Sequence, residues 1–523
     1  MPALSSMNDQ ALQLLAQLGA QGVGVGLAAN GKGGGLATDS RALKPGEVFL
    51  AWPGARDDGR RHIGAAVAAG AAAVLYEAED YSWNPAWNLP SIAVKGLRDL
   101  AGYLAHEVYG RPTQRLWTIG VTGTNGKTSC SQWLAQACTA CGARTAVVGT
   151  LGIGLQGRLV AGVNTTPDPV LLHRSLAELL ADGAQGVAME VSSIGLEQGR
   201  VNGVEFGAAL FTNLSRDHLD YHGDMESYAR AKQKLFEMPG LRHAILNMDD
   251  VQGVQIARLL SGRPDRTSVN RIGYSVFEGV AQRAGLEGWM EAHNVNVGAQ
   301  GISFVVKSSW GEARIDSALL GRFNVANLLG VLSTMLVSGV PFDAATAALA
   351  RLEPVPGRLQ RLGGNGRPLV VVDFAHTPDA LEKALVALKD SVRAECGGSG
   401  GRLVCVFGCG GERDRGKRAL MGAVAARHAE RIVLTSDNPR SEEPAEILAQ
   451  ILEGIPPAVA GSVTVETDRA AAIRLALADA NAGDVVLLAG KGHEDYQEIM
   501  GRKLPFSDTA EAALALQEWK AAA

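Results

Sequence analysis

LWTIGVTGTNGKTS, residues 116–129, joins a strand pattern to a glycine-rich loop and a helix start. Leu116–Val121 is an apolar run typical of a buried strand. The loop then ends in Lys127 and Thr128, and a helix pattern follows from about Thr128. In this order, glycines let backbone N–H groups approach phosphate oxygens, and the lysine reaches the terminal phosphates. The segment therefore predicts a nucleotide-binding loop in an α/β domain.

The loop departs in one place from the general pattern G-x-x-x-x-G-K-[ST], because Val121 stands at the first glycine position. GTPases, kinases and motor ATPases use related loops, so the loop alone predicts nucleotide binding and leaves the reaction open. A hydroxyl at its end can hold Mg²⁺. The residues predicted to bind ATP here are Gly123, Thr124, Asn125, Gly126, Lys127, Thr128 and Ser129.

Apolar runs alternate with helical segments on the C-terminal side of the loop. Strands are predicted at Thr145–Val148, Gly186–Glu190, Ala208–Thr212 and Ala244–Asn247. Residues 280–317 show strand-like alternation and suggest a β insertion or an edge hairpin, and residues 321–337 return to a helix pattern. This alternation predicts a doubly wound parallel sheet in a central domain, residues 112–355.

Two further α/β domains are predicted on either side. In residues 1–111, strands at Gly46–Ala51 and Ala73–Tyr76 enclose a helix at Ile63–Gly70, and Arg111-Pro112 forms a plausible joint. Residues 356–523 are expected to form a Rossmann-like domain. Its strands are predicted at Leu369–Asp373, Leu403–Phe407, Arg431–Thr435 and Asp484–Ala489. Polar clusters follow each of them, where ligands bind in open α/β sheets.

Composition narrows the class of protein. The chain has 523 residues, enough for about three domains, with 46% hydrophobic and 20% charged residues. A formal net charge of -5 without a long basic run argues against a nucleic-acid partner. No signal peptide and no apolar run long enough for a membrane span are found. We expect a cytoplasmic, monomeric enzyme with small-molecule substrates, whose six cysteines, Cys138 and Cys141 among them, are reduced packing residues.

The loop form TGTNGKT resembles the Mur ligase family, which also includes folylpolyglutamate synthetases. Further matching segments follow in the family's order and span almost the whole chain: Glu190–Ser193, Asn213–His222, Tyr228–Lys232, Gly321–Asn327, Pro356–Arg358 and Asp373–Pro378. The resemblance implies three α/β domains and an ATP-dependent ligase that forms an amide bond through an acyl phosphate.

Three segments resemble one type of member, which joins meso-2,6-diaminopimelate to UDP-N-acetylmuramoyl-L-alanyl-D-glutamate: Thr38–Arg41, Asn164–Asp168 and Asp437–Arg440. Diaminopimelate is lysine with a second carboxylate, which an arginine can bind bidentately, whereas lysine leaves that arginine unpaired. An alternative for Arg440 is a surface ion pair with Glu442 or Glu443. Lysine-adding ligases, folylpolyglutamate synthetases and a non-catalytic nucleotide-binding protein remain alternatives for the whole chain.

The resemblance also implies roles for individual residues. The catalytic group is Lys127, Glu190, His218 and Lys232. Mg²⁺ would be bound by Thr128, Glu190, His218 and, if carbamylated, Lys232. Further ATP contacts are Asn327, Arg358, Asp373 and His376. The UDP-dipeptide contacts are Ser40, Asn164, Thr165, Thr166, Ser192, Gln198 and Arg200. The diaminopimelate contacts are Arg413, Asp437, Asn438, Pro439, Arg440, Gly490 and Glu494.

The sequence departs from the family pattern at two positions. Ile194 stands where many relatives have histidine, which removes a polar group from the substrate cleft. Phe374 stands where many have tyrosine, so the ring is kept and a hydroxyl is lost. Residues 55–57, where relatives contact uracil, are too variable to assign.

Overall fold

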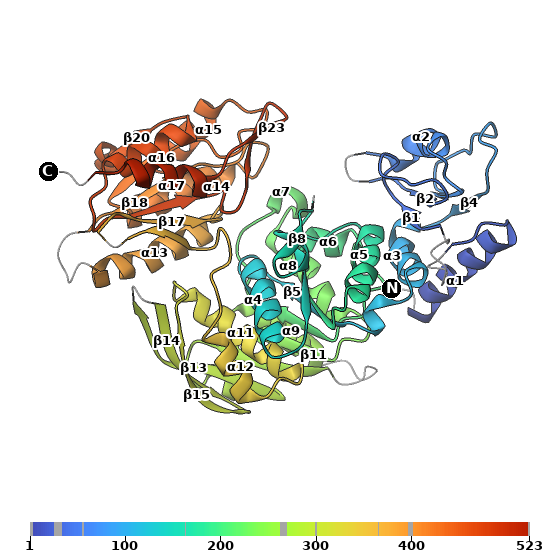
Figure 1. Ribbon diagram of the computed structural model, residues 1–523, viewed down its shortest axis with the longest axis horizontal. Helices are drawn as coiled ribbons and strands as arrows, with labels where there is room; N and C mark the ends of the chain where they lie inside the picture. Colours follow the sequence, from blue (N-terminus) through green and yellow to red (C-terminus); the bar gives the residue numbers. More distant parts are fainter. Residues whose placement is uncertain are drawn as a thin grey trace.

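The computed structural model describes residues 4–25, 34–54, 57–162, 164–261, 269–298, 301–364, 366–395 and 401–520. Three α/β domains follow one another along the chain, and the N-terminal and C-terminal domains contact different parts of the central one (Figure 1). No helix among the described residues is both long enough and apolar enough to cross a membrane.

The N-terminal domain has a parallel four-stranded sheet in the order β1-β2-β3-β4. Its strands are β1 (Leu36–Ala37), β2 (Val48–Ala51), β3 (Ala73–Glu77) and β4 (Ser91–Val94), and its helices are α1 (Leu4–Ala20), α2 (Ile63–Ala68) and α3 (Leu97–Val108). The predicted strands and helix of this region are confirmed. Helix α3 also packs on α5 (Pro169–Ala181) of the central domain, where Arg174 forms an ion pair of 2.8 Å with Glu47.

The central domain is built on an eleven-stranded sheet in the order β15-β14-β13-β12-β11-β10-β5-β9-β6-β7-β8. The strands are β5 (Trp117–Thr122), β6 (Thr145–Gly149), β7 (Gly152–Leu155), β8 (Arg158–Val160), β9 (Gly186–Glu190), β10 (Ala208–Phe211), β11 (His243–Asn247), β12 (Asn270–Ser275), β13 (Gly288–Gly298), β14 (Gly301–Ser308) and β15 (Gly311–Ser317). The helices are α4 (Lys127–Ala140), α5 (Pro169–Ala181), α6 (Ser193–Glu197), α7 (Leu219–His222), α8 (Met225–Gln233), α9 (Val251–Ser261), α10 (Val280–Arg283), α11 (Phe323–Val337) and α12 (Phe342–Leu349).

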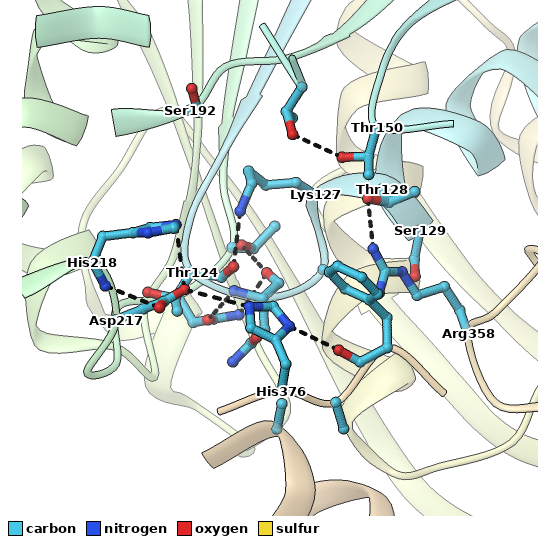
Figure 2. A pocket seen from close by; sticks show the side chains of 18 of the residues that line it. Thr124, Lys127, Thr128, Ser129, Thr150, Ser192, Asp217, His218, Arg358 and His376 are labelled. Atoms are coloured by element: carbon cyan, nitrogen blue, oxygen red, sulfur yellow. Dashed lines mark hydrogen bonds and ion pairs between the residues drawn. The ribbon is translucent and has the colours of Figure 1, made fainter. Parts of the chain in front are cut away.

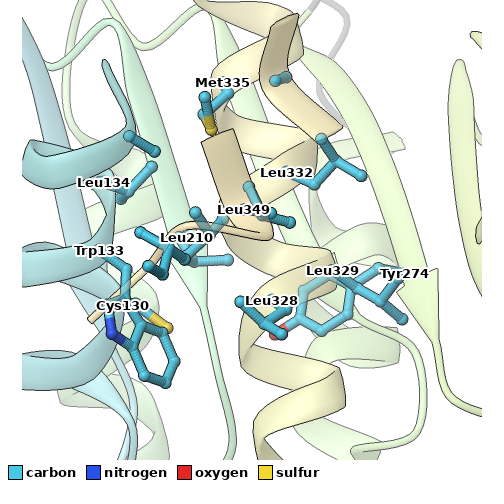
Figure 3. Close-up of a cluster of buried hydrophobic side chains, with 14 of the residues drawn as sticks. Cys130, Trp133, Leu134, Leu210, Tyr274, Leu328, Leu329, Leu332, Met335 and Leu349 are labelled. Carbon is cyan, nitrogen blue, oxygen red and sulfur yellow. The ribbon is translucent and has the colours of Figure 1, made fainter. Parts of the chain in front are cut away.

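The middle of this sheet is parallel, as predicted, from β6 through β9, β5, β10, β11 and β12 to β13. Residues 288–317 extend one edge as the antiparallel strands β13, β14 and β15, whereas residues 280–283 form a helix. The hairpin β7–β8 at the other edge was not predicted. Helices α4 and α11 bury Trp133, Leu134, Leu328 and Leu332 against one face (Figure 3).

The C-terminal domain has a six-stranded sheet in the order β16-β17-β21-β18-β19-β20, and only β16 runs antiparallel to its neighbour. The strands are β16 (Gln360–Gly363), β17 (Leu369–Asp373), β18 (Leu403–Phe407), β19 (Arg431–Leu434), β20 (Val463–Val465) and β21 (Val485–Ala489), with a separate hairpin of β22 (Tyr496–Ile499) and β23 (Arg502–Pro505). The helices are α13 (Pro378–Glu395), α14 (Gly416–His428), α15 (Pro444–Leu452), α16 (Arg469–Ala478) and α17 (Asp508–Glu518). The four predicted strands are present.

A buried ion pair braces the loop that follows β19. Arg469, the first residue of α16, forms two hydrogen bonds of 2.7 Å with the carboxylate of Asp508, and both side chains are fully buried. The same guanidinium donates to the carbonyl oxygens of Ser436 and Ala489, at 3.3 and 2.9 Å. Arg469 therefore links the carboxyl ends of β19 and β21 through their backbone oxygens.

Replacement of this arginine is expected to destabilise the C-terminal domain. Arg469→Met leaves the Asp508 carboxylate buried without a partner, which should lower the free energy of unfolding by about 3–5 kcal/mol. Urea unfolding followed by circular dichroism measures the change. Arg474→Met on the same helix is the control, because its ion pair with Glu511 is half exposed and should contribute less than about 1 kcal/mol. An equal loss of unfolding free energy in both variants would contradict a special stabilising role for the Arg469–Asp508 pair.

Candidate functional site

A cavity of about 820 Å³ lies between the central and C-terminal domains. Its lining comes from the loops after β5, β9 and β10 on one side and after β17, β18, β19 and β21 on the other. Because the carboxyl ends of parallel strands meet at one edge of a sheet, two such edges face each other here. Figure 2 shows part of this lining around the loop after β5.

The loop after β5 depends on two glycines in conformations that side chains rarely adopt. Gly123 has φ +148, and an added Cβ would lie 1.9 Å from the Thr212 hydroxyl oxygen. Gly126 has φ +86, and its Cβ would lie 2.6 Å from Oδ1 of Asn327. The Lys127 ammonium donates to the carbonyl oxygens of Gly123 and Thr124, at 2.9 and 2.8 Å. The lysine therefore lies folded along its own loop.

Glu190, at the end of β9, is fully buried and holds the start of α4. Its carboxylate accepts from the Thr128 hydroxyl at 2.8 Å and from the backbone N–H of Thr150 at 2.8 Å. Arg358 of the C-terminal domain donates to the same Thr128 hydroxyl at 3.0 Å. No cation of the described chain lies within ion-pair distance of Glu190. A buried carboxylate beside a hydroxyl, both lining the cavity, is a donor set that suits Mg²⁺.

Lys232 on α8 is 1% exposed and donates to the carbonyl oxygen of Gly123 at 2.8 Å. Its ammonium lies 4.3 Å from the centre of the Tyr228 ring. Burial lowers the pKa of Lys232 well below its ordinary value, and the nearby charge of Lys127 lowers it further. Burial therefore makes the charged form of this amine less favourable than at the surface.

Asp217 connects the two walls of the cavity, although sequence reasoning gave it no role. Its carboxylate lies 3.4 Å from Nε2 of His218 and 4.0 Å from Nε2 of His376 in the C-terminal domain. Burial alone would raise the pKa of Asp217, but the charges of these histidines, Lys417 and Lys127 bring it to about 2. His218 adopts a left-handed conformation with φ +53. The structure pairs His218 with Asp217 rather than with Glu190.

Further contacts join the phosphate loop to the C-terminal domain. Asp379, in the first turn of α13, accepts from the Asn125 amide at 2.8 Å and from the Ser215 hydroxyl at 3.2 Å. The Phe374 ring lies under the Arg358 guanidinium, 4.5 Å from its centre. Sequence reasoning missed Asp379 and Thr150, since neither stands in a pattern that marks a ligand. Phe374 keeps the aromatic face that this stacking needs.

The loops after β19 and β21 bring together an amide, a carboxylate and an ammonium. Asn438 donates to Glu494 at 2.8 Å, and the fully buried Lys491 donates to Asn438 at 3.0 Å and to Glu494 at 2.9 Å. Burial raises the pKa of Asp437, while the charge of Lys491 opposes this effect. Lys491, which had no predicted role, thus neutralises part of the negative charge of the loops.

Arg440 lines the same end of the cavity in a left-handed conformation with φ +51. Its guanidinium donates to the carbonyl oxygen of Gly411 at 2.8 Å and lies 3.2 Å from the Glu498 carboxylate of β22. The alternative ion pair with Glu442 or Glu443 is wrong. Glu442 accepts instead from Arg418, at 2.9 Å.

Only some of the residues expected to contact the UDP-dipeptide line the cavity. Thr165 and Ser192 line the cavity, and Thr166 is hydrogen-bonded to Ser192 at 3.1 Å behind it. Arg200 donates to the carbonyl oxygen of Thr166 at 2.8 Å. Of the predicted site residues, those that do not line the cavity are Ser40, Gly123, Asn164, Thr166, Gln198, Arg200 and Pro439. Residues 55 and 56 lie outside the described part of the chain.

The other predicted residues do line the cavity: Thr124, Asn125, Gly126, Lys127, Thr128, Ser129, Glu190, His218, Lys232, Asn327, Arg358, Asp373, His376, Arg413, Asp437, Asn438, Arg440, Gly490 and Glu494, together with the departing Ile194 and Phe374. Among the described residues, no three His, Cys, Asp or Glu side chains are grouped as a metal-binding cluster. Five cysteines of the described chain are free, Cys138 and Cys141 included.

Comparison with known proteins identifies relatives along most of the chain. The Mur ligase middle domain matches residues 121–335, the Mur ligase glutamate ligase domain matches residues 357–492, and the catalytic domain of the Mur ligase family matches residues 34–109. The UDP-N-acetylmuramoyl-L-alanyl-D-glutamate–2,6-diaminopimelate ligase of Chromobacterium violaceum is 50% identical over 482 residues, 92% of this chain and 94% of that protein. The ligase of the same name from Pseudomonas aeruginosa is 50% identical over 485 residues, 93% of this chain and 95% of that protein.

Solved structures agree. A structure of a UDP-N-acetylmuramoyl-L-alanyl-D-glutamate–2,6-diaminopimelate ligase is 36% identical and has a TM-score of 0.64, covering 92% of this chain and 94% of that one. A folylpolyglutamate synthase of Mycobacterium tuberculosis is 20% identical, with a TM-score of 0.59 over 74% of this chain and 91% of that one, and shares the fold. The three matching domains and the half-identical relatives show that the chain belongs to the Mur ligase family.

Proposed function

We infer that the protein is an ATP-dependent ligase that joins meso-2,6-diaminopimelate to UDP-N-acetylmuramoyl-L-alanyl-D-glutamate, a step of peptidoglycan precursor synthesis. One observation carries this inference: a single cavity is lined by the phosphate loop and Glu190 on one side and by Asn438, Arg440 and Glu494 on the other. An ATP loop and a pocket for a charged amino acid thus open into the same space. The half-identical relatives bear the name of this reaction.

The central domain supplies the groups for the first step. The Lys127 ammonium would leave the carbonyl oxygens of its own loop and bind the terminal phosphates, beside the loop N–H groups. Thr128 and Glu190 would hold Mg²⁺, with His218 and a carbamylated Lys232 as further candidates. Mg²⁺ bound there would neutralise charge on the phosphate oxygens. The γ-carboxylate of the D-glutamate residue then displaces ADP from the γ-phosphorus atom, which gives an acyl phosphate.

The C-terminal domain supplies the second substrate. Arg413 and Arg440 would bind the carboxylates of diaminopimelate, and Glu494, with Asp437, Asn438, Pro439 and Gly490 around it, would bind an ammonium group. The free amine attacks the acyl carbon, the C–N bond forms, and phosphate leaves as the C–O bond breaks. Arg440 is already held in place by its contacts with Gly411 and Glu498.

The remaining contacts extend the site toward the N-terminal domain. Ser40 would contact the UDP moiety, and Asn164, Thr165, Thr166, Ser192, Gln198 and Arg200 would contact the muramoyl dipeptide. Asn327, Arg358, Asp373 and His376 would contact ATP. Arg358 has the strongest structural support of these four, because it reaches from the C-terminal domain to Thr128 of the phosphate loop.

Lys232 is proposed to be carbamylated. Only a neutral amine adds to carbon dioxide, and burial lowers the pKa of Lys232 well below its ordinary value, which makes the neutral form easier to reach. The product is an anion in place of a cation, which removes repulsion with Lys127 and adds a possible Mg²⁺ ligand.

The reaction itself is tested with purified protein, ATP, Mg²⁺ and the UDP-dipeptide. Phosphate release and a UDP-tripeptide product detected by mass spectrometry are expected with diaminopimelate, and far less with lysine. Faster turnover with lysine would assign the protein to lysine-adding ligases. Absence of phosphate release with all substrates present would indicate a non-catalytic nucleotide-binding protein.

Arg440→Met is expected to weaken diaminopimelate binding by roughly 100-fold or more in KM, because a charge-assisted bidentate contact is lost. The loop after β19 should keep its conformation, since Arg469 holds its backbone through the carbonyl oxygen of Ser436. Steady-state kinetics with varied diaminopimelate measure the change. Arg427→Met is the matched control, because Arg427 is mostly exposed and does not line the cavity. An unchanged KM in Arg440→Met would remove this residue from the pocket.

Lys232→Arg is expected to abolish carbamylation and reduce kcat/KM by roughly 100-fold or more, because arginine keeps the positive charge and cannot accept carbon dioxide. With ¹³C-labelled bicarbonate, a carbamate signal in the NMR spectrum should be present at neutral pH in the unmodified sequence and lost in the variant. Lys234→Arg serves as the control, since Lys234 is more exposed and pairs with Glu197 at 2.7 Å. Retention of the signal in Lys232→Arg would place the carbamate elsewhere.

A further inference from the structure

Lys417 is a buried lysine with no predicted role. It is the second residue of α14, its side chain is only 8% exposed, and it lines the cavity. Two more deeply buried lysines have acceptors: Lys232 donates to Gly123, and Lys491 donates to Asn438 and Glu494. Within the described part of the chain, no hydrogen bond or ion pair engages the Lys417 ammonium. Because this side chain lines the cavity, its positive charge is available to an anionic ligand there.

The start of α14 adds to this positive potential. The N-terminus of a helix carries partial positive charge from unpaired N–H groups, and Lys417 extends it into the cavity. Asp414, just before the helix, accepts a hydrogen bond from the Gly416 N–H at 2.9 Å. That carboxylate also lies 3.4 Å from Arg216 of the central domain. Asp414 is therefore already engaged by other donors.

The position of Lys417 indicates which substrate group it faces. Lys417 and His376 line the cavity from the C-terminal domain, and Lys127 and Asp217 line it from the central domain. The two lysines therefore reach one cavity from opposite domains. The pocket around Asn438 and Glu494 already has Arg413 and Arg440 for two carboxylates. The Lys417 ammonium at the start of α14 is therefore free to bind the phosphate rather than a carboxylate.

We propose that the Lys417 ammonium binds an oxygen of the phosphoryl group as it passes from ATP to the substrate carboxylate and leaves as inorganic phosphate. This proposal rests on the proposed ligase function. The P–O bond to ADP breaks while the P–O bond to the carboxylate forms, and later the acyl C–O bond breaks as the amine adds. Lys417 keeps its proton throughout and supplies positive charge where the phosphoryl oxygens carry negative charge.

This role would make transfer depend on the domain that binds the amino acid. Lys127 belongs to the central domain and Lys417 to the C-terminal domain, so the phosphoryl group is enclosed only when the two domains are packed together. ATP hydrolysis without an amine acceptor would thereby be limited.

The kinetic test compares Lys417→Gln, Lys417→Arg and the control Lys389→Gln, whose lysine lies on α13, is a third exposed and does not line the cavity. Lys417→Gln is expected to lower kcat by roughly 100-fold or more, with KM for ATP and diaminopimelate changed by less than about threefold. Lys417→Arg should recover part of kcat. A raised KM for diaminopimelate with unchanged kcat would overturn the proposal in favour of a carboxylate site.

A binding test needs no turnover and so separates this proposal from the ligase function. Inorganic phosphate is titrated by calorimetry into protein saturated with MgADP. The unmodified sequence and Lys389→Gln should bind it, and Lys417→Gln should bind at least about tenfold more weakly. Equal affinity in Lys417→Gln and Lys389→Gln overturns the proposal. If the Gln variant fails to fold by circular dichroism, Lys417→Met takes its place, and unchanged phosphate affinity in that variant overturns the proposal.

Discussion

Two ammonium groups converge on one backbone oxygen in this protein, and much of the site is arranged around that contact. The carbonyl oxygen of Gly123 accepts from Lys127 at 2.9 Å and from Lys232 at 2.8 Å. Lys232 is buried and Lys127 is half-buried, so two positive charges at this spacing would repel each other strongly. The repulsion is relieved if one amine is neutral or if an anion arrives. A phosphate loop of this kind is therefore electrostatically prepared for a polyanion such as the phosphates of ATP.

The sheets were predictable where strands are buried on both faces. The runs at β5, β9, β17 and β18 are continuous and apolar, and their predicted bounds lie within a residue of those observed. The edges were harder. The β7–β8 hairpin is glycine-rich and short, and a strand paired on one side needs no continuous apolar run. Residues 288–317 alternate in polarity because they form such an edge, which is the edge-hairpin alternative of the prediction, and the sheet continues through them.

The site was predictable only as separate clusters at the ends of strands. Sequence order cannot show that Asp217 lies beside His376, or that Asn125 is bound by Asp379, because these partners are far apart in the chain and meet when two domains pack. Arg440 shows the same limit at shorter range. Nearby glutamates were the obvious partners, yet a bridge to Ile499 brings Glu498 of the hairpin to it. Tertiary packing, rather than local sequence, selects the counter-charge.

The buried pair of Arg469 and Asp508 has a consequence for how selectivity could change over time. It holds the backbone of the loop before Arg440 through Ser436, yet Arg469 does not line the cavity. Residues that face the amino acid can therefore be exchanged while the loop keeps its path. The side chains that would contact the amino acid differ from those that hold the loop, so the former can be exchanged without loss of stability. A family with this division can acquire new amino-acid preferences by a few changes on the cavity side of one loop.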